Sequence, residues 1–295
     1  MVLIAVVGAG MMGIKIAGEL AYHGHRVKIH DSNLSSLNKV HEVLNYDLKQ
    51  LRAEGLISQA QFLGQVFCMS LLEEAVKDAE LIIEAVIEDL EVKKELFHYI
   101  AQNCKSDAVI ASNTMCLDIN DINSKTAHKE RTLGLRFLFP VYYIPEVEIC
   151  PAKVTTTGVI ERVRRMVEKM GKTLFFRSGQ QPLVLSEQQR EDRKIARQKE
   201  MLLTSGIGEY RERTVPGLRH KGNEDVEKMH KEEGVIPSDL DRDCAICMER
   251  VRDCLLQPCH HMVTCFPCGQ MLQDRRDACP ICRKNIEQTI KVFHT

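Results

Sequence analysis

Two parts of this 295-residue chain carry side chains whose types and spacing could do chemistry. The first part lies near the C-terminal end, where seven cysteines and one histidine occur as four close pairs. Thiolate and imidazole are ligands that zinc prefers, and eight of them are enough for two tetrahedral sites. We therefore expect two Zn²⁺ ions, bound by Cys244 with Cys247, Cys259 with His261, Cys265 with Cys268, and Cys279 with Cys282.

The second part is a glycine-rich loop near the N-terminal end. Gly8, Gly10 and Gly13 directly follow an apolar run and open a helical stretch, and Asp31 ends the next strand-like run. In this setting Gly8 permits a tight turn, Gly10 lets the backbone approach a pyrophosphate, and Gly13 allows close helix–strand packing. Asp31 would accept hydrogen bonds from ribose hydroxyls, which favours NAD over NADP. The alternative is a fold of this kind that has lost its nucleotide.

The elements that position the glycine loop alternate between apolar strand-like runs and amphipathic helical ones. This alternation is typical of a doubly wound parallel sheet, so we expect an α/β Rossmann-like domain over residues 1–179. The expected strands are residues 2–7, 27–30, 81–85, 108–111, 133–139 and 173–176. The expected helices are residues 12–23, 34–52, 88–102 and 162–170.

The segment that follows, residues 180–240, is densely charged and nearly free of aromatic residues. Ser186 and Gln189 have the spacing of a capping box, which predicts a helix of about 17 residues that Gly206 and Gly208 would end. A second short helix is expected over residues 223–233. Neither helix has a wide apolar face, so we expect a partly helical linker before a small zinc domain over residues 241–295.

Charge and cysteine usage exclude several function classes. The chain has 40 Lys and Arg against 41 Asp and Glu, so neither nucleic acid nor an anionic membrane is expected as a partner. No apolar run approaches the length of a membrane span. The cysteines outside the four pairs are scattered, as free thiols of a reducing compartment would be. Because a strand is expected to begin at Val2, without room for a signal peptide, we expect a cytoplasmic protein.

The C-terminal array resembles a RING finger of C3HC4 order, the E2-recruiting module of many ubiquitin ligases. The resemblance implies a small α+β fold with a cross-brace, in which the first and third ligand pairs share one zinc and the second and fourth share the other. One ion would then be bound by Cys244, Cys247, Cys265 and Cys268, and the other by Cys259, His261, Cys279 and Cys282. His260 is expected at the surface, and Cys254 is expected as a buried thiol.

The same resemblance suggests how the module would act. Ile246 and Pro280 match positions of the apolar platform that binds an E2 enzyme, and Arg283 matches the arginine that contacts both E2 and ubiquitin. Such a guanidinium can donate to several carbonyl oxygens at once. The implied partners are an E2 enzyme, ubiquitin and an unidentified protein substrate.

The last ten residues, 286–295, alternate like a strand and carry Phe293 close to the end. They resemble the tails of inhibitor-of-apoptosis-type RING ligases, which pair two RING domains. On this resemblance we expect a homodimer with Phe293 at the interface. The alternative is a tail strand that packs on its own RING domain.

Residues 83–97, 111–117 and 134–149 resemble successive blocks of the 3-hydroxyacyl-CoA dehydrogenase N-terminal domain. In that family a histidine base is oriented by a glutamate, while a serine and an asparagine position the substrate oxygen. Glu148 matches the glutamate, but Arg136 replaces the histidine. Met115 and Phe139 replace the serine and the asparagine. Arginine carries only donors and keeps its proton, so Arg136 cannot act as the base, and an ion pair with Glu148 is expected instead.

Cofactor binding is a separate question from turnover. Glu88 and Lys93 match positions that contact NAD in that family, which keeps NAD(H) as an expected cofactor beside the two Zn²⁺. The alternative for Glu88 and Lys93 is a solvated helix start. After Leu185 the chain enters the charged linker, where the resemblance would place an all-helical domain that forms the other substrate wall.

These observations favour a RING-type E3 ubiquitin ligase with a catalytically inactive dehydrogenase domain. That domain would bind the substrate, NAD(H) or an acyl-CoA. One alternative is an active NAD-dependent 3-hydroxyacyl-CoA dehydrogenase with an accessory zinc domain. Another is a non-enzymatic zinc-binding scaffold.

Overall fold

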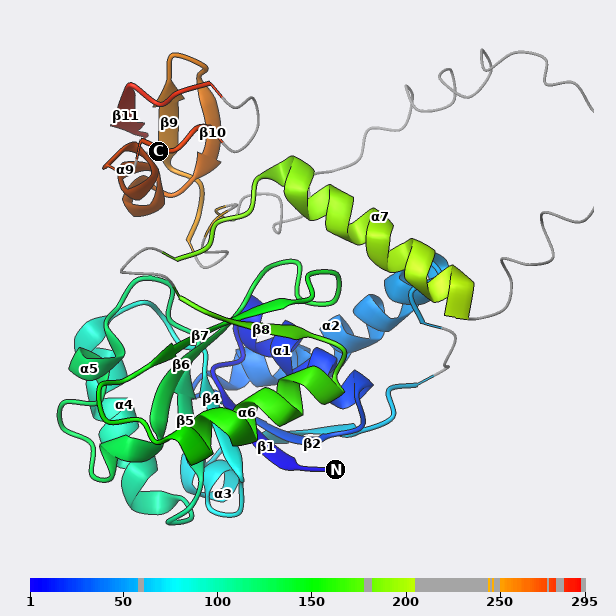
Figure 1. Ribbon diagram of the computed structural model, residues 1–295, viewed down its shortest axis with the longest axis vertical. Helices are drawn as coiled ribbons and strands as arrows, with labels where there is room; N and C mark the ends of the chain where they lie inside the picture. The colour runs from blue at the N-terminus through cyan, green and yellow to red at the C-terminus, as the bar shows by residue number, and fades with distance from the viewer. Residues whose placement is uncertain are drawn as a thin grey trace, which may run out of the picture. The chain divides into compact units, whose positions relative to one another are not determined.

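The computed structural model describes residues 1–57, 61–177, 182–204, 244, 246, 250–274, 276–279 and 284–292. The chain divides into two compact units, residues 1–195 and 196–295 (Figure 1). Within the described residues, no helix combines the length and the apolar character that crossing a membrane requires.

The first unit is built on an eight-stranded sheet in the order β3-β2-β1-β4-β5-β6-β7-β8. Its strands are β1 (Leu3–Val7), β2 (Arg26–His30), β3 (Gln65–Met69), β4 (Leu81–Glu84), β5 (Val109–Ser112), β6 (Thr132–Phe137), β7 (Glu146–Pro151) and β8 (Thr173–Phe176). Neighbouring strands run parallel except β6 and β7, which are antiparallel. The glycine loop directly follows β1, a strand inside the sheet. It therefore lies at the carboxyl edge of the sheet, where open α/β folds bind ligands.

Helices cover both faces of this sheet (Figure 1). They are α1 (Met11–Tyr22), α2 (Leu34–Ala53), α3 (Leu72–Val76), α4 (Leu90–Asn103), α5 (Ile119–Ile122), the 3-10 helix Lys129–Arg131, α6 (Thr157–Lys169) and α7 (Glu187–Thr204). Within β1, Ile4 and Val6 pack in the core with α1, α2 and α6, whereas Ala5 and Val7 pack in the core with α3, α4 and α5. A strand buried on both faces is uniformly apolar, as its sequence is. The predicted doubly wound Rossmann-like fold is confirmed.

Helix α7 begins at the predicted capping box. The Ser186 hydroxyl accepts from the Gln189 N–H at 3.2 Å, and the Gln189 side chain accepts from the Ser186 N–H at 2.9 Å. Arg193 on this helix donates to Glu146 at 2.7 Å, and Lys194 lies 3.3 Å from Glu54. Polar contacts therefore attach the first half of α7 to the sheet unit. The second predicted helix, residues 223–233, lies outside the described residues.

In its described residues after α7, the second unit contains a three-stranded antiparallel sheet in the order β10-β9-β11 and the helix α9. Its elements are β9 (Cys254–Gln257), β10 (His261–Thr264), α9 (Phe266–Asp274) and β11 (Gln288–Lys291). A Cβ on Gly269 of α9 would lie 2.3 Å from the Cys254 sulfur, so the missing side chain lets α9 lie close against β9. The predicted small α+β fold is confirmed.

Candidate functional site

The three loop glycines differ in what the fold requires of them. Gly8 has a φ of +111°, and a Cβ there would lie 2.5 Å from the Ala85 carbonyl oxygen. A Cβ on Gly13 would lie 1.8 Å from the Gly8 carbonyl oxygen. A Cβ on Gly10 would meet no atom within 4 Å, and Gly10 has an ordinary φ of −72°. The packing of the protein therefore requires glycine at positions 8 and 13 but not at position 10. The open space at Gly10 is available to a ligand.

The surroundings of Gly10 fit a dinucleotide. Gly10 is the N-cap of α1, which has no side-chain cap and no acidic residue in its first turn. A helix start of this kind favours a phosphate through its N–H groups and dipole. Asp31 follows the last residue of β2, and its carboxylate reaches the glycine loop. It accepts hydrogen bonds from the N–H groups of Ala9 at 2.7 Å and Asn33 at 2.8 Å. These residues fit NAD(H), whose nicotinamide ring would supply hydride chemistry when bound.

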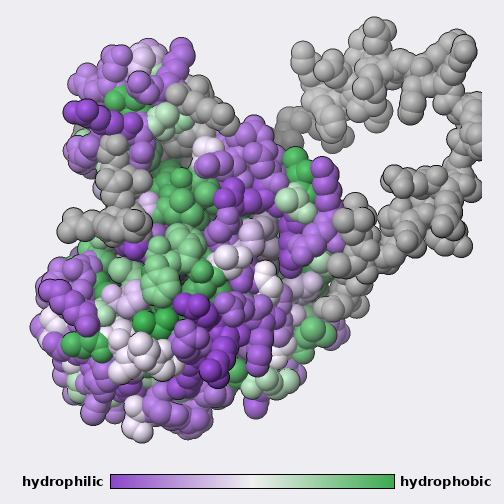
Figure 2. All heavy atoms as spheres, in the orientation of Figure 1, coloured by the Kyte–Doolittle hydropathy of each residue, from purple (hydrophilic) through white to green (hydrophobic). Residues whose placement is uncertain are grey.

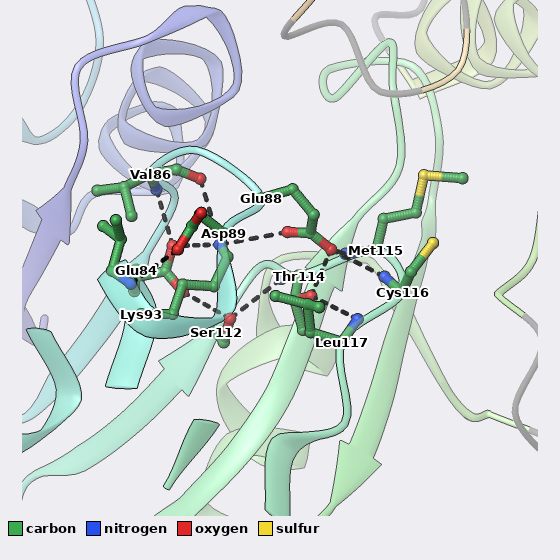
Figure 3. A network of polar contacts seen from close by, with 11 residues as sticks. Glu84, Val86, Glu88, Asp89, Lys93, Ser112, Thr114, Met115, Cys116 and Leu117 are labelled. Atoms are coloured by element: carbon green, nitrogen blue, oxygen red, sulfur yellow. Dashed lines mark hydrogen bonds and ion pairs between the residues drawn. The ribbon is translucent and has the colours of Figure 1, made fainter. Parts of the chain in front are cut away.

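Lys93 and Glu88 belong to a buried polar network (Figure 3). The Lys93 ammonium, 1% exposed, lies 2.6 Å from Glu84 and 3.3 Å from Glu88, and it donates to the Val86 carbonyl oxygen at 3.2 Å. The alternative of a solvated helix start therefore does not hold for Lys93. Its ammonium is engaged by internal acceptors, which compensate for the loss of water.

The Glu88 carboxylate joins the loop between β4 and α4 to the loop after β5 in the same network (Figure 3). It accepts from the Thr114 hydroxyl at 2.5 Å and from the N–H groups of Met115 at 2.8 Å and Cys116 at 2.9 Å. Burial acts to raise the pKa of Glu88, but Lys93 and these hydrogen bonds outweigh it and hold the pKa below 4.5. The carboxylate is thus ionised and already supplied with donors.

Arg136 and Glu148 face each other across the antiparallel pair β6 and β7, where they occupy register-paired positions. The guanidinium lies 3.2 Å from the carboxylate, which confirms the expected ion pair, and donates to the Leu183 carbonyl oxygen at 2.9 Å. Arg177 also donates to Glu148, at 2.7 Å, and the Leu183 N–H donates to its other oxygen at 3.0 Å. The sequence analysis missed Arg177 and Leu183, for which no motif gave a signal.

In this cluster Arg136 offers only donors, so it cannot accept a proton as the histidine of a base dyad does. Glu148 is 1% exposed and its two oxygens take donors from Arg136, Arg177 and Leu183. Burial lowers the pKa of Arg136 and the Glu148 carboxylate acts against that shift, so the guanidinium keeps its proton. Met115, at the serine position, is 8% exposed and offers no hydroxyl. The arrangement is a buried cluster of two cations and one anion.

The second unit brings six of the eight predicted zinc ligands into two groups. The sulfur atoms of Cys244, Cys265 and Cys268 lie within 4.8 Å of one another. The ligand atoms of Cys259, His261 and Cys279 do the same, and His261 Nδ1 is 3.6 Å from the Cys279 sulfur. The first ligand pair thus meets the third, and the second meets the fourth. Each group has the soft and borderline donors that suit tetrahedral zinc.

Other predicted residues of this unit are placed in part. Cys254 is 0% exposed, and burial raises the pKa of its thiol, as a structural cysteine requires. His260 is exposed in a turn. Ile246 packs beside the cluster of Cys244, Cys265 and Cys268. Four predicted site residues and the tail phenylalanine lie outside the described residues: Cys247, Pro280, Cys282, Arg283 and Phe293.

Two family models match separate parts of the chain. Residues 3–176 match the model described as 3-hydroxyacyl-CoA dehydrogenase, NAD binding domain. Residues 240–289 match the model described as zinc finger, C3HC4 type (RING finger). Both expected resemblances are confirmed, and with the two ligand groups they support zinc and NAD(H) as the cofactors.

Several proteins are similar to this chain over about half of its length or more. A 3-hydroxybutyryl-CoA dehydrogenase of Clostridioides difficile is 30% identical over 172 residues, 57% of this chain and 61% of that protein. A peroxisomal fatty acid beta-oxidation multifunctional protein of Arabidopsis thaliana is 33% identical over 159 residues, 53% of this chain and 22% of that protein. The crystal structure of 3-hydroxybutyryl-CoA dehydrogenase from Escherichia coli K12 has a TM-score of 0.56 at 28% identity, covering 59% of this chain and 37% of that one. The chain therefore spans at most about three fifths of these relatives' length.

Proposed function

Because this chain belongs to the 3-hydroxyacyl-CoA dehydrogenase NAD-binding domain family and also carries a C3HC4-type RING finger, we propose that it is a RING-type E3 ubiquitin ligase. In this proposal residues 1–179 form a binding domain without dehydrogenase activity. Residues 180–240 form a linker, and residues 241–295 form the ligase module with two structural Zn²⁺ ions.

The observation that carries this proposal is the Arg136–Glu148 cluster. A dehydrogenase of this family needs a proton acceptor where Arg136 stands, and Arg136 offers only donors. Its guanidinium is 11% exposed and is hydrogen-bonded to Glu148 and to the backbone of Leu183. The RING finger then remains as the part that could transfer a group.

The ligase module would act by positioning. Ile246 and Pro280 would offer an apolar surface to the E2, and Arg283 would donate hydrogen bonds to carbonyl oxygens of E2 and ubiquitin. A substrate lysine amine would attack the E2–ubiquitin thioester carbonyl, forming an amide as the carbon–sulfur bond breaks and the E2 thiolate leaves. The ligase supplies no nucleophile, and its contribution is orientation.

The dehydrogenase-like domain would select what is brought to the ligase. Gly8, Gly10, Gly13 and Asp31 would hold the pyrophosphate and ribose of NAD(H). Glu88 and Lys93 would support the cofactor side of this site through the network of Figure 3. A thermal shift with millimolar NAD or NADH tests this part of the proposal, and the absence of any shift would contradict it.

The decisive experiment is in-vitro autoubiquitination of the full chain with a panel of E2 enzymes. Arg283→Ala should abolish ubiquitin transfer while zinc content stays the same, because Arg283 is not a zinc ligand. Lys284→Ala, which removes the next cation along the chain, is the matched control and should keep activity. Equal activity of Arg283→Ala and the parent protein would reject the ligase and favour a scaffold.

The tail supplies a partner proposal, a homodimer with Phe293 at the interface. Deleting the last six residues should abolish self-ubiquitination and convert a dimer to a monomer in light scattering. Phe293→Ala should do the same if that side chain is the contact. Undiminished activity after the deletion would refute the dimer.

A second candidate is an active NAD-dependent 3-hydroxyacyl-CoA dehydrogenase with an accessory zinc domain. The intact glycine loop, with its open position at Gly10, favours it. It predicts NADH consumption with acetoacetyl-CoA, whereas the Arg136–Glu148 cluster predicts none.

A further inference from the structure

A groove lies at the end of the first unit opposite the glycine loop, where β1 begins and α6 covers the sheet. Residues that border it are Val2, His25, Arg162, Arg165, Met166 and Lys169, and its volume is about 450 Å³. Ligand pockets for small molecules occupy roughly 300–1,000 Å³. Val2 precedes β1 and Gly8 follows it, so the groove and the dinucleotide loop are separated by the length of the strand.

The α6 wall of the groove is rich in cations. Arg162, Arg165 and Lys169 are spaced by three and four residues, which places them on one face of the helix. Strongly hydrophilic side chains cover the visible surface over α6 (Figure 2). Arg162 donates to the carbonyl oxygens of Asp107 at 2.8 Å and Glu80 at 3.0 Å, and is fixed by them.

Arg165 and Lys169 differ from Arg162 in having no such anchors. Both are exposed, and neither forms an ion pair or a side-chain hydrogen bond with the described part of the chain. Glu161 also borders the groove, but its carboxylate is paired with Arg164 at 3.4 Å. On this rim of the groove, the positive charges of Arg165 and Lys169 are therefore not neutralised by neighbouring carboxylates among the described residues.

Another wall of the groove carries a buried histidine ring with one unpaired nitrogen. His25 is 8% exposed, and its Nδ1 atom forms no hydrogen bond with the residues that the structure describes. Burial is the main cause that lowers the pKa of His25, which keeps the ring neutral at pH 7. A buried polar atom left unpaired costs about 1–3 kcal/mol, so a ligand that reached Nδ1 would relieve a cost.

The start of α6 leaves room for a ligand. Gly158 borders the groove, and a Cβ on it would meet no atom within 4 Å. Thr156, the N-cap of this 13-residue helix, makes no side-chain cap, and the first turn has no acidic residue. The backbone N–H groups at the start of α6 and the three cations of this wall would therefore attract an anion, against one carboxylate of the same wall, Glu161.

We propose that this groove binds a small organic anion, with its charged group between Arg165 and Lys169 and its apolar body against Val2 and Met166. The polar edge of the body would lie toward His25. This site goes beyond the proposed ligase function and does not depend on it.

Calorimetric titration of the full chain with phenyl phosphate and with benzoate tests the proposal and distinguishes a phosphate from a carboxylate. At least one of the two should bind with a stoichiometry of one. Arg165→Ala combined with Lys169→Ala should lower the affinity at least tenfold. The matched control is Lys39→Ala combined with Lys49→Ala, two exposed cations of α2, which should leave the affinity unchanged.

His25→Phe keeps a ring in the wall but removes Nδ1, and it should weaken binding several-fold while the melting temperature stays within a few degrees. The proposal is overturned if neither anion binds. It is also overturned if the α2 double variant weakens binding as much as the α6 double variant, because the anion would then respond to net charge alone.

Discussion

At the scale of single residues, a substitution at Gly10 can separate the effect on folding stability from the effect on ligand binding. Gly10→Asp should leave stability unchanged or slightly raised, because aspartate is a good N-cap and the added side chain enters open space. It should lower NAD affinity at least tenfold, because a carboxylate would occupy the place of the pyrophosphate. Thermal melts with and without NAD measure both effects.

Gly13→Ala is the contrasting variant, since its Cβ would overlap the Gly8 carbonyl oxygen. It should lower the melting temperature markedly even without a ligand. If Gly10→Asp instead destabilised the protein as Gly13→Ala does, Gly10 would be structural and the argument for a reserved phosphate position would fail.

The negative charge of Glu148 balances two buried guanidinium groups, those of Arg136 and Arg177. Glu148→Gln should cost about 3–5 kcal/mol of the free energy of unfolding, because two buried guanidinium groups lose the anion that they share. Urea denaturation gives this value. Glu161→Gln breaks a half-exposed pair with Arg164 and should cost less than about 1 kcal/mol. Equal costs for the two variants would show that the cluster is not electrostatically coupled.

The Arg136 pair itself could be predicted from the sequence, because a base position filled by arginine beside a retained glutamate leaves few other outcomes. The contacts from Arg177 and Leu183 could not. They lie 29 and 35 residues from Glu148, and only the return of the chain after β8 brings them to it.

At the scale of elements, sequence patterns identified six of the eight strands of the first sheet and missed β3 and β7. Strand β3 is an edge strand whose side chains are only partly buried, although its run of residues 66–69 is continuously apolar and could have predicted it. Strand β7 contains Glu146 and Glu148, charges that a strand pattern disfavours. Their partners, Arg193 for Glu146 and the Arg136 cluster for Glu148, come from elements distant in sequence.

The start of α7 offers a prediction at this scale, because its capping box was expected from two residues. Ser186→Ala should cost about 1 kcal/mol and raise amide exchange in the first turn of α7. Adding Gln189→Ala should cost little more, since each side chain caps the other's N–H. Hydrogen exchange read by mass spectrometry resolves the first turn. Additive costs of the two changes would contradict a reciprocal box.

At the scale of the whole molecule, the two units are stabilised by different means. The first has extensive apolar clusters on both faces of its sheet. Among its described residues the second has few buried apolar side chains, including Leu256, Val263, Leu272 and Ile286, and the other buried residues there are mostly cysteines. A domain of about 55 residues with so small a core rarely folds without disulfides or a structural metal ion. Bound zinc supplies the missing folding free energy, and the spacing of the cysteines is enough to predict it.

Removing zinc should therefore unfold one unit and spare the other. A chelator should abolish the structure of residues 241–295, while the melting transition of the first unit stays within a few degrees, because a structural zinc site supplies folding free energy only to its own domain. Lowering the pH should act in the same direction, since protons compete with the metal for thiolate and imidazole. Calorimetry should resolve two transitions in the zinc-loaded protein and one in the chelated protein, and added Zn²⁺ should restore the second. A first transition that falls together with the second would show that the two units fold as one.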